Sequence, residues 1–179
     1  EPMSIVDTRA MMCIRINSLV KGCSGIQRTV IEQLVTYLNE DIIPVVPRIG
    51  SLGASGDLAP LSHMALALIG EGEVWGDDVP VKTSAKLKEK GYIGVVLAAK
   101  DGLSLINGTS QMCSFLVNVE MRLSNLLPLA DLIACTSMEA RTCSIRPMDK
   151  RVHQARPHHG QLLVAERITQ IMKDSPILA

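Results

Sequence analysis

Apolar residues recur every three or four positions over most of this chain, which is the spacing of one face of an α-helix. Glycines and prolines interrupt the pattern and separate one stretch from the next. The pattern predicts helices at 5–19, 26–38, about 59–69, 83–90, 107–140 and 160–173. Pro128 lies inside the longest of these stretches, and we expect a kink there. The chain is therefore expected to be mainly α-helical.

A few short segments depart from this helical pattern. Val74–Lys82 favours a hairpin that turns at Gly76-Asp77-Asp78. Val95–Ala98 favours a short strand, and Asp101-Gly102 favours a turn. Ser24 stands just before the second helical stretch, where a serine side chain commonly caps the first turn. We therefore expect a few short strands beside the helices, with Ser24 as a helix cap.

Composition narrows the classes of protein to which the chain can belong. A length of 179 residues fits one ordinary domain or a piece of a larger one, so no separate second domain is expected. Hydrophobic residues make up 47%, which excludes global disorder. Lys and Arg number 18, Asp and Glu also number 18, and aromatic residues make up 2%. With neither net positive charge nor aromatic platforms, nucleic acid is not an expected partner.

The cysteines and the apolar runs indicate a cytoplasmic protein. There are five cysteines, an odd number, and none forms a C-x-x-C pair, which favours a reducing compartment. The beginning of the chain lacks a charged segment followed by an apolar one, so no signal peptide is expected. The most apolar run, Leu58–Gly70, is about 13 residues long and too short to span a membrane. We expect no membrane association.

The stretch most informative about chemistry is Gly50–Asp57, which contains three glycines before a predicted helix. It is compatible with an ordinary glycine-rich turn. A serine hydrolase would need a G-x-S-x-G elbow, but Asp57 stands where the last glycine belongs. A third alternative is chemistry of the backbone itself at Ala54-Ser55-Gly56, because each of these residue types has a use in such a reaction.

In that reaction the Gly56 amide nitrogen attacks the Ala54 carbonyl carbon and closes a five-membered ring. Glycine suits the attack because it has no Cβ to hinder the approach. One water leaves as the ring forms, and a second leaves with the hydroxyl of Ser55, which creates an exocyclic methylidene. The product is an electrophile that no standard side chain supplies.

Four stretches resemble the aromatic amino acid ammonia-lyases and 2,3-aminomutases, in the same order along essentially the whole chain. Gly50–His63 resembles the signature of this family, and is most similar to that of histidine ammonia-lyases. Arg15–Gly22 is similar to an early helix of the family, and Leu105–Thr109 contains its Asn-Gly-Thr motif. Ala155–Gln161 is similar to a segment after the central helices. The chain is therefore identified as a member of this family, in the form of an internal fragment.

The resemblance implies roles for particular residues. Ala54-Ser55-Gly56 would cyclise to 4-methylidene-imidazol-5-one (MIO), and Asp57 would help to form or hold the ring. Asn107 would lie near the ring and bind the substrate amine, with Leu105 as a second substrate-binding residue. Elementary electrostatics agrees, because helices beginning near Pro60 and near Asn107 would direct their positive ends at the ring. Asn107 is also compatible with a plain helix cap.

The implied reaction is the non-oxidative removal of ammonia from an aromatic or imidazole amino acid. The signature favours histidine, which would give urocanate. Ser110 stands where histidine ammonia-lyases often have glutamine and resembles tyrosine-type enzymes. Tyrosine or phenylalanine ammonia-lyase and 2,3-aminomutase therefore stay open as alternatives, and a non-catalytic helical subunit or scaffold is an alternative of another class.

The resemblance also implies a fold and partners. The family's fold is a bundle of long helices assembled as a homotetramer, in which 107–140 would pack. We expect 1–179 to be a single partial domain, because the family's catalytic tyrosine and carboxylate-binding residues have no counterpart here. The chain alone would lack a complete active site and would associate with the rest of a split or cleaved enzyme, or with further copies.

Metal and nucleotide cofactors are not expected. His153, His158 and His159 lack the spacing of a metal site, since adjacent histidines point in different directions. Gly70–Gly76 departs from the G-x-G-x-x-G pattern because its last glycine comes one residue late.

Overall fold

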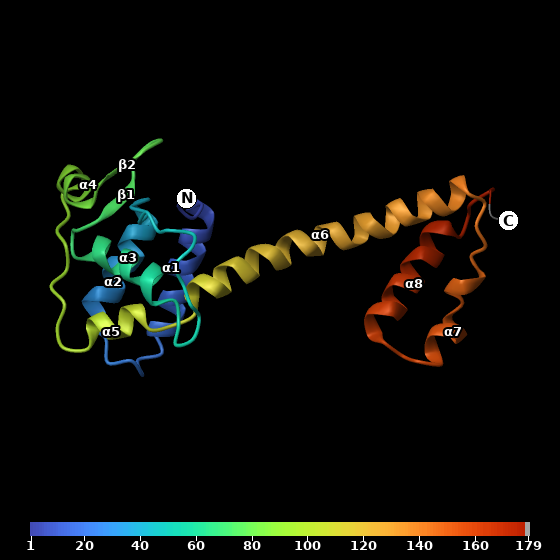
Figure 1. Cartoon of the computed structure of the whole chain (residues 1–179), viewed down its shortest axis with the longest axis horizontal. Coiled ribbons are helices and arrows are strands. Elements are labelled where there is room, and N and C mark those ends of the chain that lie inside the picture. Colours follow the sequence, from blue (N-terminus) through green and yellow to red (C-terminus); the bar gives the residue numbers. More distant parts are fainter. Residues whose placement is uncertain (178–179) are drawn as a thin grey trace. The chain divides into compact units, whose positions relative to one another are not determined.

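The computed structural model describes residues 1–177 of the chain. The chain divides into two compact units, Glu1–Asn118 and Val119–Ala179, which we call unit 1 and unit 2 and describe separately. One long helix, α6, crosses the boundary between them (Figure 1). The single partial domain expected from the sequence stays a prediction.

The chain is mainly α-helical, as predicted, with one short hairpin. In chain order the elements are α1 (Ile5–Leu19), α2 (Arg28–Asn39), α3 (Leu58–Leu68), β1 (Glu73–Trp75), β2 (Pro80–Lys82), α4 (Thr83–Lys90), α5 (Asp101–Ile106), α6 (Ser110–Ala140), the 3₁₀ turn η1 (Arg146–Met148), α7 (Lys150–Gln154) and α8 (His159–Met172). The helices predicted at 5–19 and 83–90 have the predicted bounds, and the other predicted helices are displaced by one to three residues at their ends. α6 continues through Pro128 without interruption, and the kink expected there stays a prediction.

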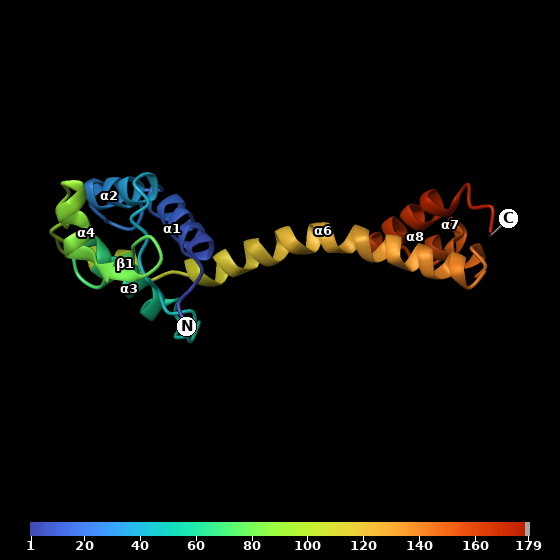
Figure 2. The ribbon, with the colours of Figure 1, turned by 90° about the horizontal axis from the view of Figure 1, so that it is seen from above.

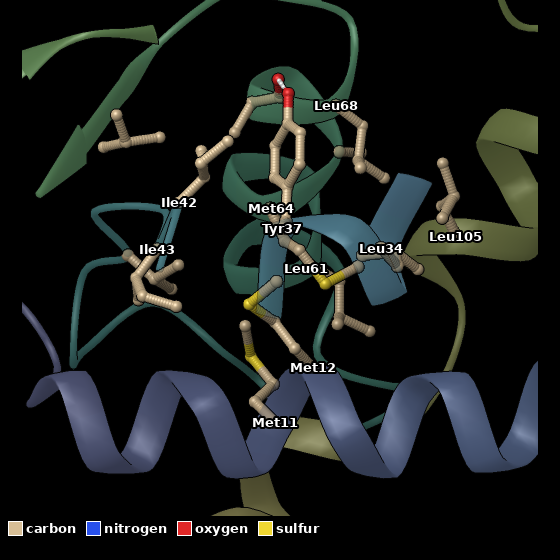
Figure 3. Close-up of a cluster of buried hydrophobic side chains, with 14 of the residues drawn as sticks. Met11, Met12, Leu34, Tyr37, Ile42, Ile43, Leu61, Met64, Leu68 and Leu105 are labelled. Carbon is tan, nitrogen blue, oxygen red and sulfur yellow. Dashed lines mark hydrogen bonds between the residues drawn. The ribbon is translucent and has the colours of Figure 1, made fainter. Parts of the chain in front are cut away.

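Unit 1 has a core built from the apolar faces of α1, α2 and α3. Methionines and branched side chains of these helices interdigitate there, with Met12, Leu34 and Leu61 fully buried (Figure 3). α1 packs beside α2 (Figure 2), and α3 packs against α5. The hydroxyl of Tyr37 donates a hydrogen bond of 2.8 Å to the carbonyl of Ala67 inside this core. Burial raises the pKa of Tyr37 to about 12, although a hydrogen bond with Gln33 acts in the opposite direction.

The hairpin predicted at 74–82 is confirmed. β1 pairs antiparallel with β2, with Val74 opposite Val81. The strand predicted at Val95–Ala98 is wrong, because this segment has no strand partner. Instead, the amide of Val95 donates to the carbonyl of Leu68 at the end of α3, at 2.8 Å. Val95 and Leu97 of this segment pack against the core as irregular chain.

Two local predictions around α2 and α5 are also wrong, and one side chain accounts for both. Asp101 begins α5 rather than a turn. Its buried carboxylate accepts hydrogen bonds of 2.8 Å from the amides of Gln27 and Ala98. Gln27, not Ser24, is therefore the residue that precedes α2, and Asp101 supplies the acceptor expected from Ser24. Burial raises the pKa of Asp101, but the hydrogen bonds from Gln27 and Ala98 outweigh it and lower the pKa overall.

Unit 2 contains most of α6 together with η1, α7 and α8. Its buried apolar cluster is small and centres on Cys135, Ile168 and Met172. An ion pair joins Arg167 to Asp131 beside this cluster. Within residues 1–177, no helix is both long enough and apolar enough to cross a membrane.

Candidate active site

The predicted reactive loop lies in unit 1 directly before α3. Ala54 and Ser55 are exposed, whereas Gly56 and Asp57 are buried. Asp57 occupies the position that precedes the first turn of α3, and its carbonyl accepts a hydrogen bond from the amide of Leu61 at 3.0 Å. The loop therefore presents Ala54 and Ser55 at the surface, while Gly56 and Asp57 are fixed in the protein.

Asp57 fixes the loop to a second helix through its carboxylate. One oxygen, Oδ2, accepts hydrogen bonds from the amides of Gln111 at 2.8 Å and Met112 at 3.0 Å. These two amides belong to the first turn of α6, which has no internal acceptor for them. The other oxygen, Oδ1, accepts from the hydroxyl of Ser51 at 2.7 Å. Asp57 thus acts as the N-terminal cap of α6, although the two lie far apart in the sequence.

The beginning of α6 does face the loop, as the sequence leads one to expect. The sequence predicted that this helix directs its positive end at the ring. In the structure, however, the first-turn amides of Gln111 and Met112 donate to the carboxylate of Asp57. The positive end of α6 is thus balanced by a carboxylate. The beginning of α3 has no such acceptor: in the part of the chain that the structure describes, no hydrogen bond is formed by the amides of Leu58 and Ala59.

The Ala-Ser-Gly loop and the Asn-Gly-Thr motif are in direct contact through their glycines. Gly56 has a φ of +120°, which favours glycine, and a Cβ at this position would lie 2.7 Å from the carbonyl oxygen of Gly108. The amide of Asp57 donates to that same oxygen at 2.6 Å. The absence of a Cβ on Gly56 is therefore needed for the two segments to approach each other this closely.

Asn107 and Leu105 have different environments. Asn107 is exposed and follows the last residue of α5, so it terminates one helix rather than capping the next, which begins at Ser110. Leu105 is fully buried within the unit 1 core (Figure 3). The roles that the resemblance implies for Asn107 and Leu105 stay predictions, as do those for Ala54-Ser55-Gly56 and Asp57.

One neighbour of this site, Arg15, was not predicted individually. It lies on α1 with only 5% of its surface exposed, and its Nη2 donates to the carbonyls of Ser104 and, at 2.9 Å, Asn107. Desolvation lowers the pKa of this guanidinium. The sequence does carry a signal, because Arg15 falls on the same helical face as Met11, Met12 and Leu19 and must therefore point inward.

An open cavity of about 860 Å³ lies in unit 2, among residues of η1, α7 and α8. Its lining includes Met148, His159, Leu163 and Glu166. None of the predicted site residues lines it.

The fold and the loop together define a class of protein. The family model described as aromatic amino acid lyase matches residues 1–179, and the chain belongs to this family. Particular relatives include histidine ammonia-lyase of Bacillus subtilis (strain 168), 44% identical over 177 residues, and histidine ammonia-lyase of Myxococcus xanthus (strain DK1622), 40% identical over 179 residues.

Solved structures agree on the fold. Tyrosine aminomutase from Streptomyces globisporus is 40% identical, with a TM-score of 0.92 over 99% of this chain and 34% of that one. Histidine ammonia-lyase from Trypanosoma cruzi is 34% identical, with a TM-score of 0.87 over 94% of this chain and 33% of that one. The two curated relatives are matched over 98–99% of this chain. The chain spans about a third of the length of these relatives, 34% and 35%.

Proposed function

We propose that this chain contributes the electrophile-forming part of a carbon–nitrogen lyase that removes ammonia from an aromatic or imidazole amino acid. The observation that carries the proposal is the construction of the loop. Ala54 and Ser55 are exposed, while Gly56 and Asp57 are held by hydrogen bonds and close contact with the beginning of α6 and with Gly108. Such a loop keeps its base fixed while its reactive end stays accessible.

The residues present fit the MIO group. Gly56 leaves the approach to its nitrogen free of a Cβ, and the Ser55 hydroxyl is available for elimination. When formed, the group supplies an electrophile that captures the substrate's nitrogen and turns the amine into a better leaving group. No metal or nucleotide is part of the proposal.

The neighbouring residues have separate tasks in this proposal. Asp57 anchors the loop to α6 and keeps its base in one conformation. The amides of Leu58 and Ala59 at the beginning of α3 supply positive potential beside the loop. Asn107, exposed next to Gly108, offers an amide group to the substrate. A general base must remove the β-proton, and we propose that a segment or subunit beyond this chain supplies it.

Histidine is the substrate that we propose first. The signature Gly50–His63 favours it, and relatives at 40–44% identity are histidine ammonia-lyases. A tyrosine or phenylalanine lyase or 2,3-aminomutase is the second candidate, favoured by Ser110 and by the likeness to tyrosine aminomutase at 40% identity.

We further propose that the chain works in the cytoplasm within a larger assembly, with a homotetramer as the expected form. Large apolar side chains along α6 are exposed, including Leu126 at 54% and Leu127 at 60%. Exposed apolar surface of this extent marks an interaction site. The scaffold alternative needs the same surface but no ring.

A product assay tests this function. The assembled protein is incubated with histidine, tyrosine or phenylalanine, and the products are separated into unsaturated acids and β-amino acids. We expect urocanate from histidine and loss of all turnover in Ser55→Ala, with unchanged helix content by circular dichroism. Ser62→Ala on α3 is the matched control and should keep activity. Full activity in Ser55→Ala would rule out the proposal, and β-amino acid products would replace the lyase by an aminomutase.

A further inference from the structure

Arg15 is a buried cation whose charge no carboxylate neutralises. Only 5% of it is exposed, and in residues 1–177 the ion pairs of the chain use other arginines: Arg9, Arg28, Arg48, Arg151 and Arg167. Burial of an arginine without a counter-charge is unfavourable. An apolar side chain would fill the same place without this penalty, so the guanidinium contributes something that packing alone does not.

The contacts of Arg15 indicate what it contributes. Its Nη2 donates to the carbonyl of Ser104 in the last turn of α5 and to the carbonyl of Asn107, the residue that terminates this helix. Carbonyls at a helix end lack partners within the helix, so a donor there fixes both the helix end and the direction of the chain beyond it. α5 has six residues and little means of holding its end by itself.

Arg15 also contacts the glycine of the Asn-Gly-Thr motif. A Cβ on Gly108 would run into Nη1 of Arg15, so the guanidinium lies directly against the main chain there. On its other side, the carbonyl of Gly108 accepts from the amide of Asp57 at 2.6 Å and faces Gly56. The guanidinium, the Gly108 main chain and the Gly56 main chain are therefore in successive contact.

We infer that Arg15 is a positioning residue, which holds Asn107 and Gly108 against the reactive loop and so sets the geometry in which the loop closes its ring. The inference deepens the proposed function and rests on it for the statement about ring closure. The statement about position stands on the contacts alone. Removing the guanidinium should therefore loosen Gly108 from Asp57 and also slow ring closure.

The positional statement is tested by hydrogen exchange at the amide of Asp57, which reports its bond to Gly108. In the protein as it is naturally produced and assembled, Arg15→Met should accelerate this exchange about tenfold. Arg15→Lys keeps a cation and donors, and should restore most of the protection. Arg9 lies on the same helix but pairs with Asp41 instead. Arg9→Met should therefore leave the exchange unchanged.

The functional statement is tested on the same samples by the rate at which the chain loses two waters in intact-mass measurements. Arg15→Met should slow this loss about tenfold or more, and Arg15→Lys should stay close to the unsubstituted chain. Met12 lies on the same helix and is fully buried in the core. Met12→Ala creates a cavity there and serves as a stability control. It should lower the melting temperature at least as much as Arg15→Met and yet leave both readouts unchanged.

Each outcome bears on the inference. Unchanged exchange in Arg15→Met, or equal changes in Met12→Ala, would overturn it. If Arg15→Met does not fold, Gly108→Ala takes its place, because the new Cβ must displace the guanidinium, and unchanged exchange there would overturn the inference equally. If the unsubstituted chain loses no water, the proposed function fails, whereas the exchange measurement still decides the position of Arg15.

Discussion

The two units differ in how far they bury their apolar side chains. Unit 1 buries a large apolar cluster in which Met12, Leu34, Leu61 and other side chains have no exposed surface. Unit 2 buries only a small cluster, although five leucines lie along its part of α6. Leu127, for example, is 60% exposed.

This difference separates two requirements of the site. The contacts of the loop through Asp57, Gly56 and Gly108 are made with atoms of unit 1. The apolar side chains along α6 are left exposed in the described residues, and an apolar surface of this kind is typical of an interaction site. We therefore assign the geometry of the loop to unit 1, and we propose that the long helix carries the assembly.

The largest expected effect concerns assembly. Replacing Leu126 and Leu127 together by glutamate places two charges on the exposed apolar surface of α6. Two charges in a buried interface would prevent association, since no cation is provided to pair with them. Sedimentation velocity should show loss of the oligomer while the helix content stays the same. An unchanged oligomer would show that this surface is not an interface.

Truncations within the two units should differ in their effect on folding. Leu34→Ala removes a fully buried side chain of unit 1 and should lower the free energy of unfolding by about 3 kcal/mol. Leu127→Ala removes an exposed side chain of unit 2, and should change the free energy of unfolding of the dissociated chain by less than about 0.5 kcal/mol. Urea denaturation measures both, and similar values would refute the contrast between the units.

Backbone geometry at the loop gives a smaller effect. Gly56→Ala should lower the free energy of unfolding by about 2 kcal/mol, because φ is +120° and the new Cβ would lie 2.7 Å from the carbonyl oxygen of Gly108. Gly102→Ala is the matched control inside α5, where a Cβ has open space. It should be neutral or stabilise by about 0.5–1 kcal/mol. Equal destabilisation by both would mean that the contact with Gly108 is not formed.

A further effect, seen only at high pH, is a pH dependence of the unit 1 core. The folded-state pKa of Tyr37 is about 12, above its ordinary value of 10.0, so folding favours the neutral phenol. The contribution of the Tyr37 phenol to the free energy of unfolding is therefore complete below about pH 10. It is lost between about pH 10 and 12, at about 1.4 kcal/mol per pH unit. In chemical denaturation across this pH range, the free energy of unfolding should decline less steeply for Tyr37→Phe than for the unsubstituted chain. Parallel curves would contradict the burial of this phenol.

Periodicity was sufficient to predict elements whose stability is local. The spacing of apolar residues gave the bounds of α1, and a lysine-rich stretch closed by Gly91 gave those of α4. Turn residues gave the hairpin of β1 and β2. The errors at Ser24, Val95 and Asp101 share a cause, since each depends on a partner distant in sequence. A single sequence read locally does not contain those pairings.

The candidate site divides in the same way. Ala54-Ser55-Gly56, Asp57 and Asn107 stand in motifs that can be recognised in the sequence alone. The contact of Gly108 with Gly56 and with Arg15 depends on how α1, α5 and the loop pack together. Arg15 has a local signal, its place on a buried helical face, but its partners emerge only in the folded unit.

The most direct test of the central claim is the intact mass of the chain, purified from its natural assembly and measured with Ser55→Ala beside it. We expect the chain to be lighter than its sequence by two water molecules, and we expect Ser55→Ala not to show this doubly dehydrated mass. A chain with its full linear mass in a properly assembled protein would contradict the account, because Ala54-Ser55-Gly56 would then be an ordinary loop.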